Sequence, residues 1–458
     1  MKVDISIDAA CDAGVVRPLH GIDNGPVCFG ALIDSTHFYK VAGFPYIRLH
    51  DTNYPHPREV DIPQIFRDFD ADENDPASYD FKATDIYLQQ CLDTGAKIIY
   101  RLGVSIEHTK YKLFVDPPKD PAKWARICCN IVRHYNEGWA NGFNWGIEYW
   151  EIWNEPDNQY FSEDRSRDPL WSGTPEQYYE LYAITSQMMK KEFPDIKVGG
   201  YGTSRLNEKY MPYFRGFLER VQRDKLPLDF FTWHRYANHP EEVFEEGQVA
   251  EEGLDSIGYG DTQLICDEWN YIPNSGVTPE PPRPFTEGTR SHGKRVAFSF
   301  SSGYGGTSFC AATMIRLHDS RTTIATHYDG HPTNYYCTMF DRYGYPEKQF
   351  YAFVKFRELY ERQRRVAVSK TTDGVYALAA GDGKSLAVLV TSFDSAAEIT
   401  LKFSGLQDGA KYRCRRYLTD IDHCHELFED PAYVAGSDGL RLELKEKATV
   451  LLLLDVEG

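Results

Sequence analysis

The stretch Tyr149-Trp150-Glu151-Ile152-Trp153-Asn154-Glu155-Pro156 is an apolar run that ends in a polar Asn-Glu pair and a proline. Aromatic and β-branched residues of this kind favour a buried strand. Because proline cannot donate to a sheet ladder, the strand ends there and Glu155 lies at its carboxyl end. In a barrel of parallel strands that end faces the active site. A surface glutamate that merely ends a strand is the simpler alternative, but the neighbouring indoles and amide suit a sugar ring.

A second carboxylate ends a similar run, Leu264-Ile265-Cys266-Asp267-Glu268-Trp269-Asn270. The separation of 268 − 155 = 113 residues accommodates three strand–helix units, which predicts Glu155 on strand four and Glu268 on strand seven. Alternation along the strand predicts that Asp267, the local competitor, points to the opposite face, away from Glu155. Retaining glycoside hydrolysis needs an acid/base and a nucleophile about 5–5.5 Å apart, and these two positions permit that distance.

Between these two runs, Phe231-Thr232-Trp233-His234-Arg235-Tyr236 is the predicted end of strand six. Alternation places His234 and Tyr236 on the same face. A phenol beside a carboxylate can hold it ionised and oriented. The alternative for His234 is a hydrogen-bonded core histidine. His50, at the end of strand two, is a weaker candidate for a contact with a sugar hydroxyl and can equally be structural.

Short β-rich runs alternate with helical patterns over the first 350 residues, and Asp120-Pro121 and Thr174-Pro175 are typical helix starts. Eight such repeats predict an α/β fold, a (β/α)8 TIM barrel. The rival, an open doubly wound sheet, lacks a glycine fingerprint or phosphate loop after an early strand. The expected strands are 46–50, 97–102, 149–154, 197–201, 229–236 and 263–268, with weaker ones at 19–22 and 308–313.

The pattern changes after the charged helix predicted over residues 355–365. Short strands separated by turn residues predict a C-terminal β-sandwich domain over residues 361–458. The catalytic barrel is expected over residues 15–360, and the alternating strand in residues 1–14 can pair with the sandwich. An extended proline-rich loop, residues 279–284, follows strand seven on the side of the active site.

Composition excludes several classes of protein. The 458 residues contain 50 Lys+Arg against 68 Asp+Glu, so the net charge is 50 − 68 = −18, which argues against nucleic acid or an anionic membrane as partner. No apolar run approaches the ~18 residues of a membrane span. The start lacks the apolar core of a signal peptide, which predicts a cytoplasmic protein, although a chain with its leader removed would look the same.

The 10 cysteines form no framework and are expected to be reduced thiols. The one metal-like cluster, His423-Cys424-His425, has no second ligand pair at suitable spacing, so no metal site and no cofactor are predicted.

Together these motifs identify the chain as similar to the large clan of retaining glycosidases built on (β/α)8 barrels. Within that clan it most resembles glycoside hydrolase family 39, which contains β-xylosidases and α-L-iduronidase. The resemblance rests on Trp153-Asn154-Glu155-Pro156 and Asp267-Glu268-Trp269-Asn270, and also on the opening 21–26, residues 46–50, His234-x-Tyr236 and the closing motif 343–353.

The resemblance implies that Glu155 is the acid/base, Glu268 the nucleophile and Asn154 the contact to the sugar 2-hydroxyl. It also implies that His50, His234 and Tyr236 line the first sugar subsite. The chain departs from the family where strand eight is expected, because residues 311–317 lack the aromatic Tyr-Trp-Thr of the xylosidases. The arginine directly after His234, Arg235, resembles the iduronidase branch of the family. That branch has a lysine at the next position, where this chain has Tyr236.

The sequence therefore predicts a retaining exo-glycosidase that resembles β-D-xylosidases and acts on a glycoside or oligosaccharide. The alternatives are a relative acting on L-arabinose, galactose or a uronic acid, and a barrel that binds sugar without cleaving it. The presence of both glutamates speaks against the last. A homo-oligomer is left open.

Overall fold

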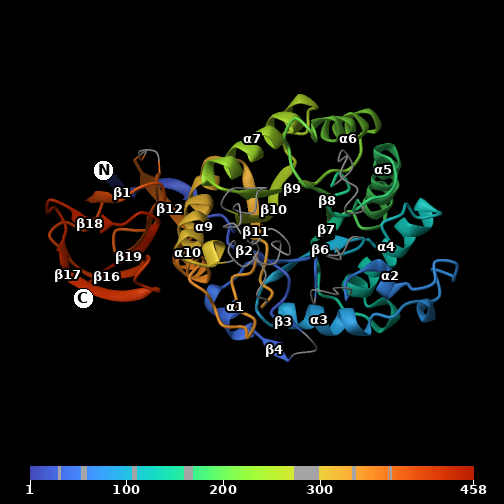
Figure 1. The fold of residues 1–458 in the computed structure, drawn as a ribbon, viewed down its shortest axis with the longest axis horizontal. Helices are drawn as coiled ribbons and strands as arrows, with labels where there is room; N and C mark the ends of the chain where they lie inside the picture. Colours follow the sequence, from blue (N-terminus) through green and yellow to red (C-terminus); the bar gives the residue numbers. More distant parts are fainter. Residues whose placement is uncertain are drawn as a thin grey trace, which may run out of the picture.

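The computed structural model describes residues 1–28, 32–52, 59–105, 111–158, 169–272, 299–332, 337–369, 371 and 374–457. Its larger part is a closed barrel of eight parallel strands surrounded by helices, and a sheet domain lies beside it (Figure 1). In the order of their pairing around the barrel, the strands are β2 (Gly21–Asp23), β5 (Tyr46–Leu49), β6 (Lys97–Leu102), β7 (Tyr149–Ile152), β8 (Lys197–Thr203), β9 (Phe230–Ala237), β10 (Gln263–Tyr271) and β11 (Thr322–His327). The predicted TIM barrel is confirmed.

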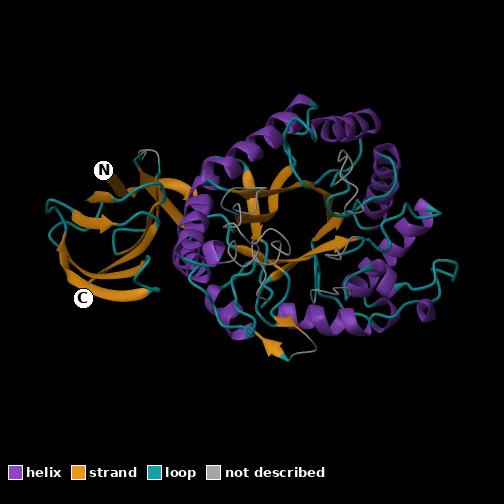
Figure 2. Cartoon of the chain, in the orientation of Figure 1, coloured by secondary structure: helices purple, strands orange, loops and turns teal. Residues whose placement is uncertain are grey.

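Helices cover the outside of the barrel, as Figure 2 shows. They are α1 (Thr36–Ala42), α2 (Ile62–Ile65), α3 (Lys82–Leu92), α4 (Pro121–Glu137), α5 (Pro175–Glu192), α6 (Met211–Asp224), α7 (Pro240–Ser256), α9 (Tyr304–Arg316) and α10 (Phe350–Arg362). A short hairpin, β3 (Val27–Cys28) with β4 (Ile33–Asp34), follows the first strand. The predicted starts of α4 and α5 are confirmed, since the side chains of Asp120 and Thr174 accept hydrogen bonds from backbone N–H groups of the first turn.

The prediction of strand eight at residues 308–313 is wrong. These residues lie inside α9, and the eighth strand is β11, nine residues further along the chain. α9 is buried on nearly all sides, so its apolar run has the same appearance in sequence as a buried strand. The real strand, Thr-Thr-Ile-Ala-Thr-His, carries polar residues that face the barrel interior, so its sequence is less apolar than that of α9.

The interior of the barrel is layered. An apolar layer near the amino ends of the strands is formed by Tyr46, Ile99, Tyr149, Phe230, Ile265 and Ile324. Two residues further along their strands, the interior positions carry Arg48, Glu151, Thr232 and Asp267, which are all fully buried. A polar cluster therefore lies on an apolar floor, and the carboxyl ends of the strands lie above it.

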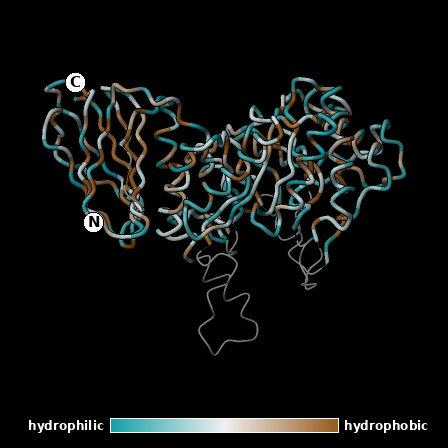
Figure 3. The backbone as a smooth tube through the Cα atoms, turned by 90° about the horizontal axis from the view of Figure 1, so that it is seen from above, coloured by the Kyte–Doolittle hydropathy of each residue, from teal (hydrophilic) through white to brown (hydrophobic). Residues whose placement is uncertain are grey.

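The predicted C-terminal sandwich is confirmed, and Figure 3 shows apolar residues along its strands. Its strands follow the order β17-β16-β19-β14-β13-β12-β1-β15-β18. They are β1 (Lys2–Val15), β12 (Arg364–Val368), β13 (Val375–Gly381), β14 (Ser385–Ser392), β15 (Ala397–Ser404), β16 (Lys411–Thr419), β17 (Glu426–Val434), β18 (Leu440–Leu444) and β19 (Ala448–Val456). The first strand of the chain, β1, pairs in parallel with β15 and antiparallel with β12.

Helices α9 and α10 lie between the barrel and the sandwich (Figure 1). From α10, the fully buried Lys355 donates to the Thr419 hydroxyl of the sandwich at 2.7 Å and lies 2.9 Å from Nδ1 of His425. The His425 ring stacks on Tyr351 and Tyr417. The His423-Cys424-His425 stretch therefore contributes to the contact between the two domains.

Candidate active site

Glu155 follows β7 in a loop with unusual backbone geometry. Trp153 and Glu155 have φ values of 73° and 44°, a region that non-glycine residues rarely adopt. Two backbone hydrogen bonds fix the loop to neighbouring strands, from Trp153 N–H to Leu102 O at 2.7 Å and from Glu155 N–H to Gly202 O at 2.9 Å. Strained residues of this kind persist where surrounding contacts determine them, and they are common in active sites.

Glu268 lies on β10 and is 5% exposed, while Glu155 is 6% exposed. The register of β10 against β9 shifts between Cys266 and Glu268, which is a β-bulge. Because of this bulge, both Asp267 and Glu268 contact Arg48 in the barrel interior, at 2.9 Å and 3.3 Å. The prediction that Asp267 points to the opposite face is therefore wrong, since simple alternation does not hold across a bulge.

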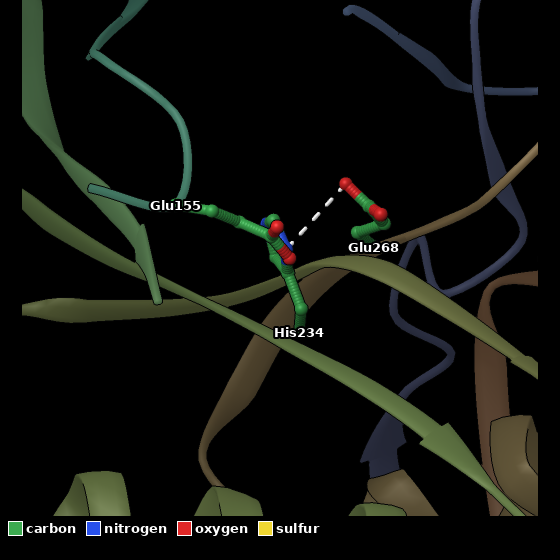
Figure 4. A group of neighbouring side chains, drawn as sticks. All are labelled: Glu155, His234 and Glu268. Carbon is green, nitrogen blue, oxygen red and sulfur yellow. Dashed lines mark hydrogen bonds and ion pairs between the residues drawn. The ribbon is translucent and has the colours of Figure 1, made fainter. Parts of the chain in front are cut away.

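The two predicted catalytic glutamates face each other across the barrel. One carboxylate oxygen of Glu155, one of Glu268 and one ring nitrogen of His234 all lie within 4.8 Å of one another. Figure 4 shows His234 next to Glu155, with Glu268 opposite them. Nδ1 of His234 is 2.8 Å from Oε1 of Glu155 and 3.4 Å from Oε2 of Glu268.

His234 also contacts a third carboxylate, because its Nε2 lies 3.3 Å from Oδ1 of Asp267. Burial alone would lower the pKa of His234, but Glu268, Asp267 and Glu155 together raise it well above its ordinary value. A protonated imidazole therefore lies between the two glutamates. Both of its ring nitrogens face carboxylates.

Glu268 is held by two donors. The Tyr236 hydroxyl donates to its Oε1 at 2.5 Å, and Arg48 Nη1 lies 3.3 Å from its Oε2. Burial raises the pKa of Glu268 to about 7. The charge of Glu155 acts in the same direction, whereas His234, Arg48 and the Tyr236 hydroxyl oppose it. Hydrogen bonds to the ionised form stabilise a carboxylate for attack.

Arg48 is the centre of the polar cluster in the barrel. Its Nε lies 2.8 Å from Glu151 and its Nη1 lies 3.1 Å from Asp23, in addition to the contacts with Asp267 and Glu268. Burial raises the pKa of Glu151 to about 8 and that of Asp23 well above its ordinary value, although Arg48 opposes both shifts. Burial also acts on Asp267, but Arg48 and His234 lower its pKa. At neutral pH, Asp267 is therefore ionised while Glu151 holds a proton.

The predicted sugar contacts Asn154 and His50 lie beside each other. Oδ1 of Asn154 accepts a hydrogen bond from Arg48 Nη2 at 2.6 Å, which directs the amide nitrogen away from Arg48. That nitrogen lies 3.4 Å from Nε2 of His50. Among the described residues, Nδ1 of the buried His50 has no hydrogen-bond partner. The structure therefore brings all six predicted site residues to the carboxyl ends of strands two, four, six and seven.

Strand eight brings an aromatic residue to the site after all. Tyr328 follows β11, and its ring centre lies 6.1 Å from that of His50 and 6.4 Å from that of Tyr236. Its hydroxyl donates to Oδ2 of Asp51 at 2.7 Å. Residues 311–316, where the aromatic Tyr-Trp-Thr of the xylosidases is missing, belong to α9, so this departure from the family does not concern strand eight. The loop predicted at 279–284 lies outside the described residues.

Three residues of the cluster were missed in the sequence: Arg48, Glu151 and Asp23. The available signal was the charge itself. Arg48 and Glu151 interrupt otherwise apolar strands, and a charged residue inside such a strand must find buried partners.

Glu155, His234 and Glu268 are also the one group of donor atoms, within the part of the chain that is described, spaced closely enough for a cation. A metal ligand must be deprotonated, and the raised pKa of His234 disfavours this. The group fits acid–base chemistry better than metal binding.

None of the described helices combines the length and apolar character of a membrane span.

Residues 35–256 match the family model described as "Glycosyl hydrolases family 39". The chain is similar to a β-xylosidase of Caldicellulosiruptor saccharolyticus, with 27% identity over 204 residues, which is 42% of this chain and 37% of that protein. The aligned segment thus spans little more than a third of the relative.

Two solved structures have the same fold over the whole chain. A glucosidase from Croceicoccus marinus has a TM-score of 0.80 at 24% identity, and all of both chains is covered. A monomeric β-xylosidase from Caulobacter crescentus CB15 has a TM-score of 0.71 at 15% identity, with 99% of each chain covered. At these identities the likeness concerns the fold alone.

Proposed function

We propose that the chain belongs to glycoside hydrolase family 39 and is a retaining glycosidase that removes a terminal sugar in the manner of a β-xylosidase. In this proposal Glu155 is the acid/base and Glu268 the nucleophile. Glu155 lies within the matched stretch 35–256, whereas Glu268 lies beyond it. The role of Glu268 therefore depends on its geometry and not on the family match.

The observation that carries the proposal is the separation of the two carboxylates. Their facing oxygens lie within 4.8 Å of each other. Retaining enzymes place these groups about 5–5.5 Å apart, whereas inverting enzymes need about 6.5–9.5 Å to leave room for a water molecule. The short separation supports direct attack by a carboxylate on the anomeric carbon.

The reaction proceeds in two steps. Glu155 donates a proton to the leaving oxygen while Glu268 attacks the anomeric carbon and forms an ester. Glu155 then removes a proton from water, and this water attacks the same carbon and releases the sugar with its configuration retained. Tyr236 and Arg48 favour the ionised form of Glu268, which the first step requires.

Glu155 must hold a proton in the first step and release it in the second. Nδ1 of His234 faces its Oε1, and the Asn158 amide donates to its Oε2. These contacts fix the plane of the carboxyl group. In this role His234 positions the acid/base, while Asn154 and His50 remain the proposed contacts to the sugar hydroxyls.

The choice of a xylosidase-like activity follows the curated relatives, which are β-xylosidases. A sugar-binding barrel without catalysis is the second candidate. The presence of both carboxylates at catalytic distance favours an enzyme.

Hydrolysis of a panel of nitrophenyl glycosides tests the proposal, with NMR of the first product formed. We expect hydrolysis of the β-D-xyloside or another terminal glycoside, with the anomeric configuration kept. Initial inversion, or no hydrolysis of any glycoside in the panel, would refute it.

A further inference from the structure

A glycine of β8 lies directly against the proposed active site. Gly202 has a φ of 61°, a left-handed conformation that residues with side chains rarely adopt. It lies where the register of β8 against β9 shifts, in a β-bulge. A Cβ atom at this position would lie 3.1 Å from Oε1 of Glu151, 3.2 Å from Nε2 of His234 and 3.4 Å from Oδ1 of Asn154. The site therefore leaves little room for any residue but glycine.

Both backbone groups of Gly202 form hydrogen bonds within the site. Its carbonyl oxygen accepts from Glu155 N–H at 2.9 Å. Its N–H donates to the hydroxyl of Thr232, on β9, at 2.6 Å. The Thr232 hydroxyl in turn donates its own proton to Oε1 of Glu151, on β7, at 2.8 Å. One fully buried hydroxyl therefore joins three neighbouring strands and supports the backbone of the acid/base.

Glu151 extends this connection to Arg48, because its Oε2 lies 2.8 Å from Arg48 Nε. The guanidinium also contacts Asp23 at 3.1 Å and Asp267 at 2.9 Å. The position of Arg48 therefore does not depend on Thr232 alone. Loss of the Thr232 hydroxyl should act mainly on β8 and on the loop of the acid/base.

We propose that Thr232 is a positioning residue for the acid/base: its hydroxyl holds Gly202, and Gly202 holds the backbone of Glu155 where protonation of the leaving group requires it. This inference rests on the glycosidase function proposed above. A buried N–H group that loses its acceptor is costly, so β8 should shift until this group finds another partner. A displacement of ~1 Å can lower the rate of a positioned catalytic group about 100-fold.

Thr232→Val tests the proposal, because valine has nearly the same shape and lacks only the hydroxyl. We expect kcat/KM on an alkyl glycoside to fall roughly 10- to 100-fold. A dinitrophenyl glycoside has a leaving group that needs no proton, so its kcat/KM should stay within about threefold of the wild-type value. Steady-state kinetics on the two substrates measure this difference.

Thr232→Ser is the matched variant, because serine keeps the hydroxyl and loses only the methyl group. It should retain most of the wild-type kcat/KM on the alkyl glycoside. Thr185→Val is the control for the loss of a buried hydroxyl. Thr185 is fully buried on the outer helix α5, and among the described residues its hydroxyl has no hydrogen-bond partner. This variant should hydrolyse both substrates at the wild-type rate.

Inactivation by an activated 2-fluoro sugar separates the acid/base from the nucleophile. This step needs Glu268 but no proton donor, so Thr232→Val should be inactivated at nearly the wild-type rate. A much slower inactivation would mean that the hydroxyl acts on the nucleophile, and it would overturn the inference.

Two other results would overturn it: an equal loss of kcat/KM on both substrates, or a Thr232→Ser variant as impaired as Thr232→Val. If Thr232→Val does not fold, Thr232→Cys keeps a weak S–H donor and should show a smaller loss that still depends on the leaving group, whereas an equal loss on both substrates would refute the inference. An active wild type combined with one of these results refutes this inference alone. A wild type that hydrolyses no glycoside refutes the proposed function as well.

Discussion

The hydroxyl of Thr203 donates a 2.6 Å hydrogen bond to Oδ2 of Asp157, and this bond joins the end of β8 to the loop that carries Glu155. The other oxygen of Asp157 accepts from the backbone N–H of Ser204 at 3.0 Å. Asp157 is fully buried and lies two residues after Glu155. Together with the bond from Glu155 N–H to Gly202 O, these contacts determine the strained geometry of the loop.

We expect Asp157→Asn to impair protonation of the leaving group. An amide cannot accept both hydrogen bonds, so the loop should relax and Glu155 should lose its alignment. The value of kcat/KM on an alkyl glycoside should fall roughly 10- to 100-fold, with little change on a dinitrophenyl glycoside. Thr203→Val, which removes only one of the two bonds, should show a smaller effect of the same kind. An equal loss on both substrates would indicate general destabilisation and not misalignment of the acid.

Glu155→Ala removes the proposed acid altogether, so it should give the largest difference between alkyl and activated aryl glycosides. Without an acid, substrates with poor leaving groups should lose far more activity than activated aryl glycosides, by a factor of about 100 or more. Azide is small and needs no base, so it should restore turnover of the activated substrate and yield a glycosyl azide. Absence of both effects would count against Glu155 as the acid/base.

Glu268 should be trapped as an ester by a 2-fluoro sugar with a good leaving group. Fluorine slows both steps, whereas the leaving group restores only the first, so the intermediate accumulates. Mass mapping should find the label on the peptide containing Cys266-Asp267-Glu268-Trp269, with fragmentation assigning it to Glu268. Asp267 is held by Arg48 and His234, and Glu268→Gln should abolish labelling altogether. Label on Asp267 or Glu155 would contradict the assignment.

Glu151 should make stability depend on pH. Its pKa is raised from 4.5 to about 8, so the folded protein keeps a proton that the unfolded chain releases in this interval. Stability should therefore fall as pH rises from about 4.5 to about 8, by an amount on the order of a few kcal/mol. Glu151→Gln cannot ionise, so the decline in Tm between pH 6 and 9 should be smaller than in the wild type. Parallel Tm curves for the two proteins would contradict this prediction.

Much of the fold and of the position of the candidate site residues could be predicted, because each depends on local pattern. Strand periodicity and the Asn-Glu-Pro ending place Glu155 at a barrel mouth, and His234 and Tyr236 follow from alternation along β9. The errors arose where tertiary structure overrides that pattern. The helix α9 is buried between two domains, so its sequence resembles that of a buried strand, and the bulge in β10 brings Glu268 to the same interior face as Asp267.

The cluster around Arg48 could not be predicted in the same way. Its members come from strands one, two, four and seven, and only the closed barrel brings them within hydrogen-bonding distance. The pairing of Asp51 with Tyr328 is similar, since 277 residues separate two side chains that share one hydrogen bond.

The pairing of β1 also determines when the sandwich can be completed during synthesis. Lys2 pairs with Glu398, so 398 − 2 = 396 residues separate the first strand from its parallel partner. At ribosomal rates of about 5–20 residues per second, β1 waits roughly 20 to 80 s before that partner exists. During this time its alternating apolar residues, Val3, Ile5 and Ile7, are an unpaired strand on a nascent chain, which is the kind of segment that chaperones bind and that aggregates when left uncovered. The sandwich therefore cannot be completed until the whole barrel, which lies between β1 and β15 in the sequence, has been synthesised.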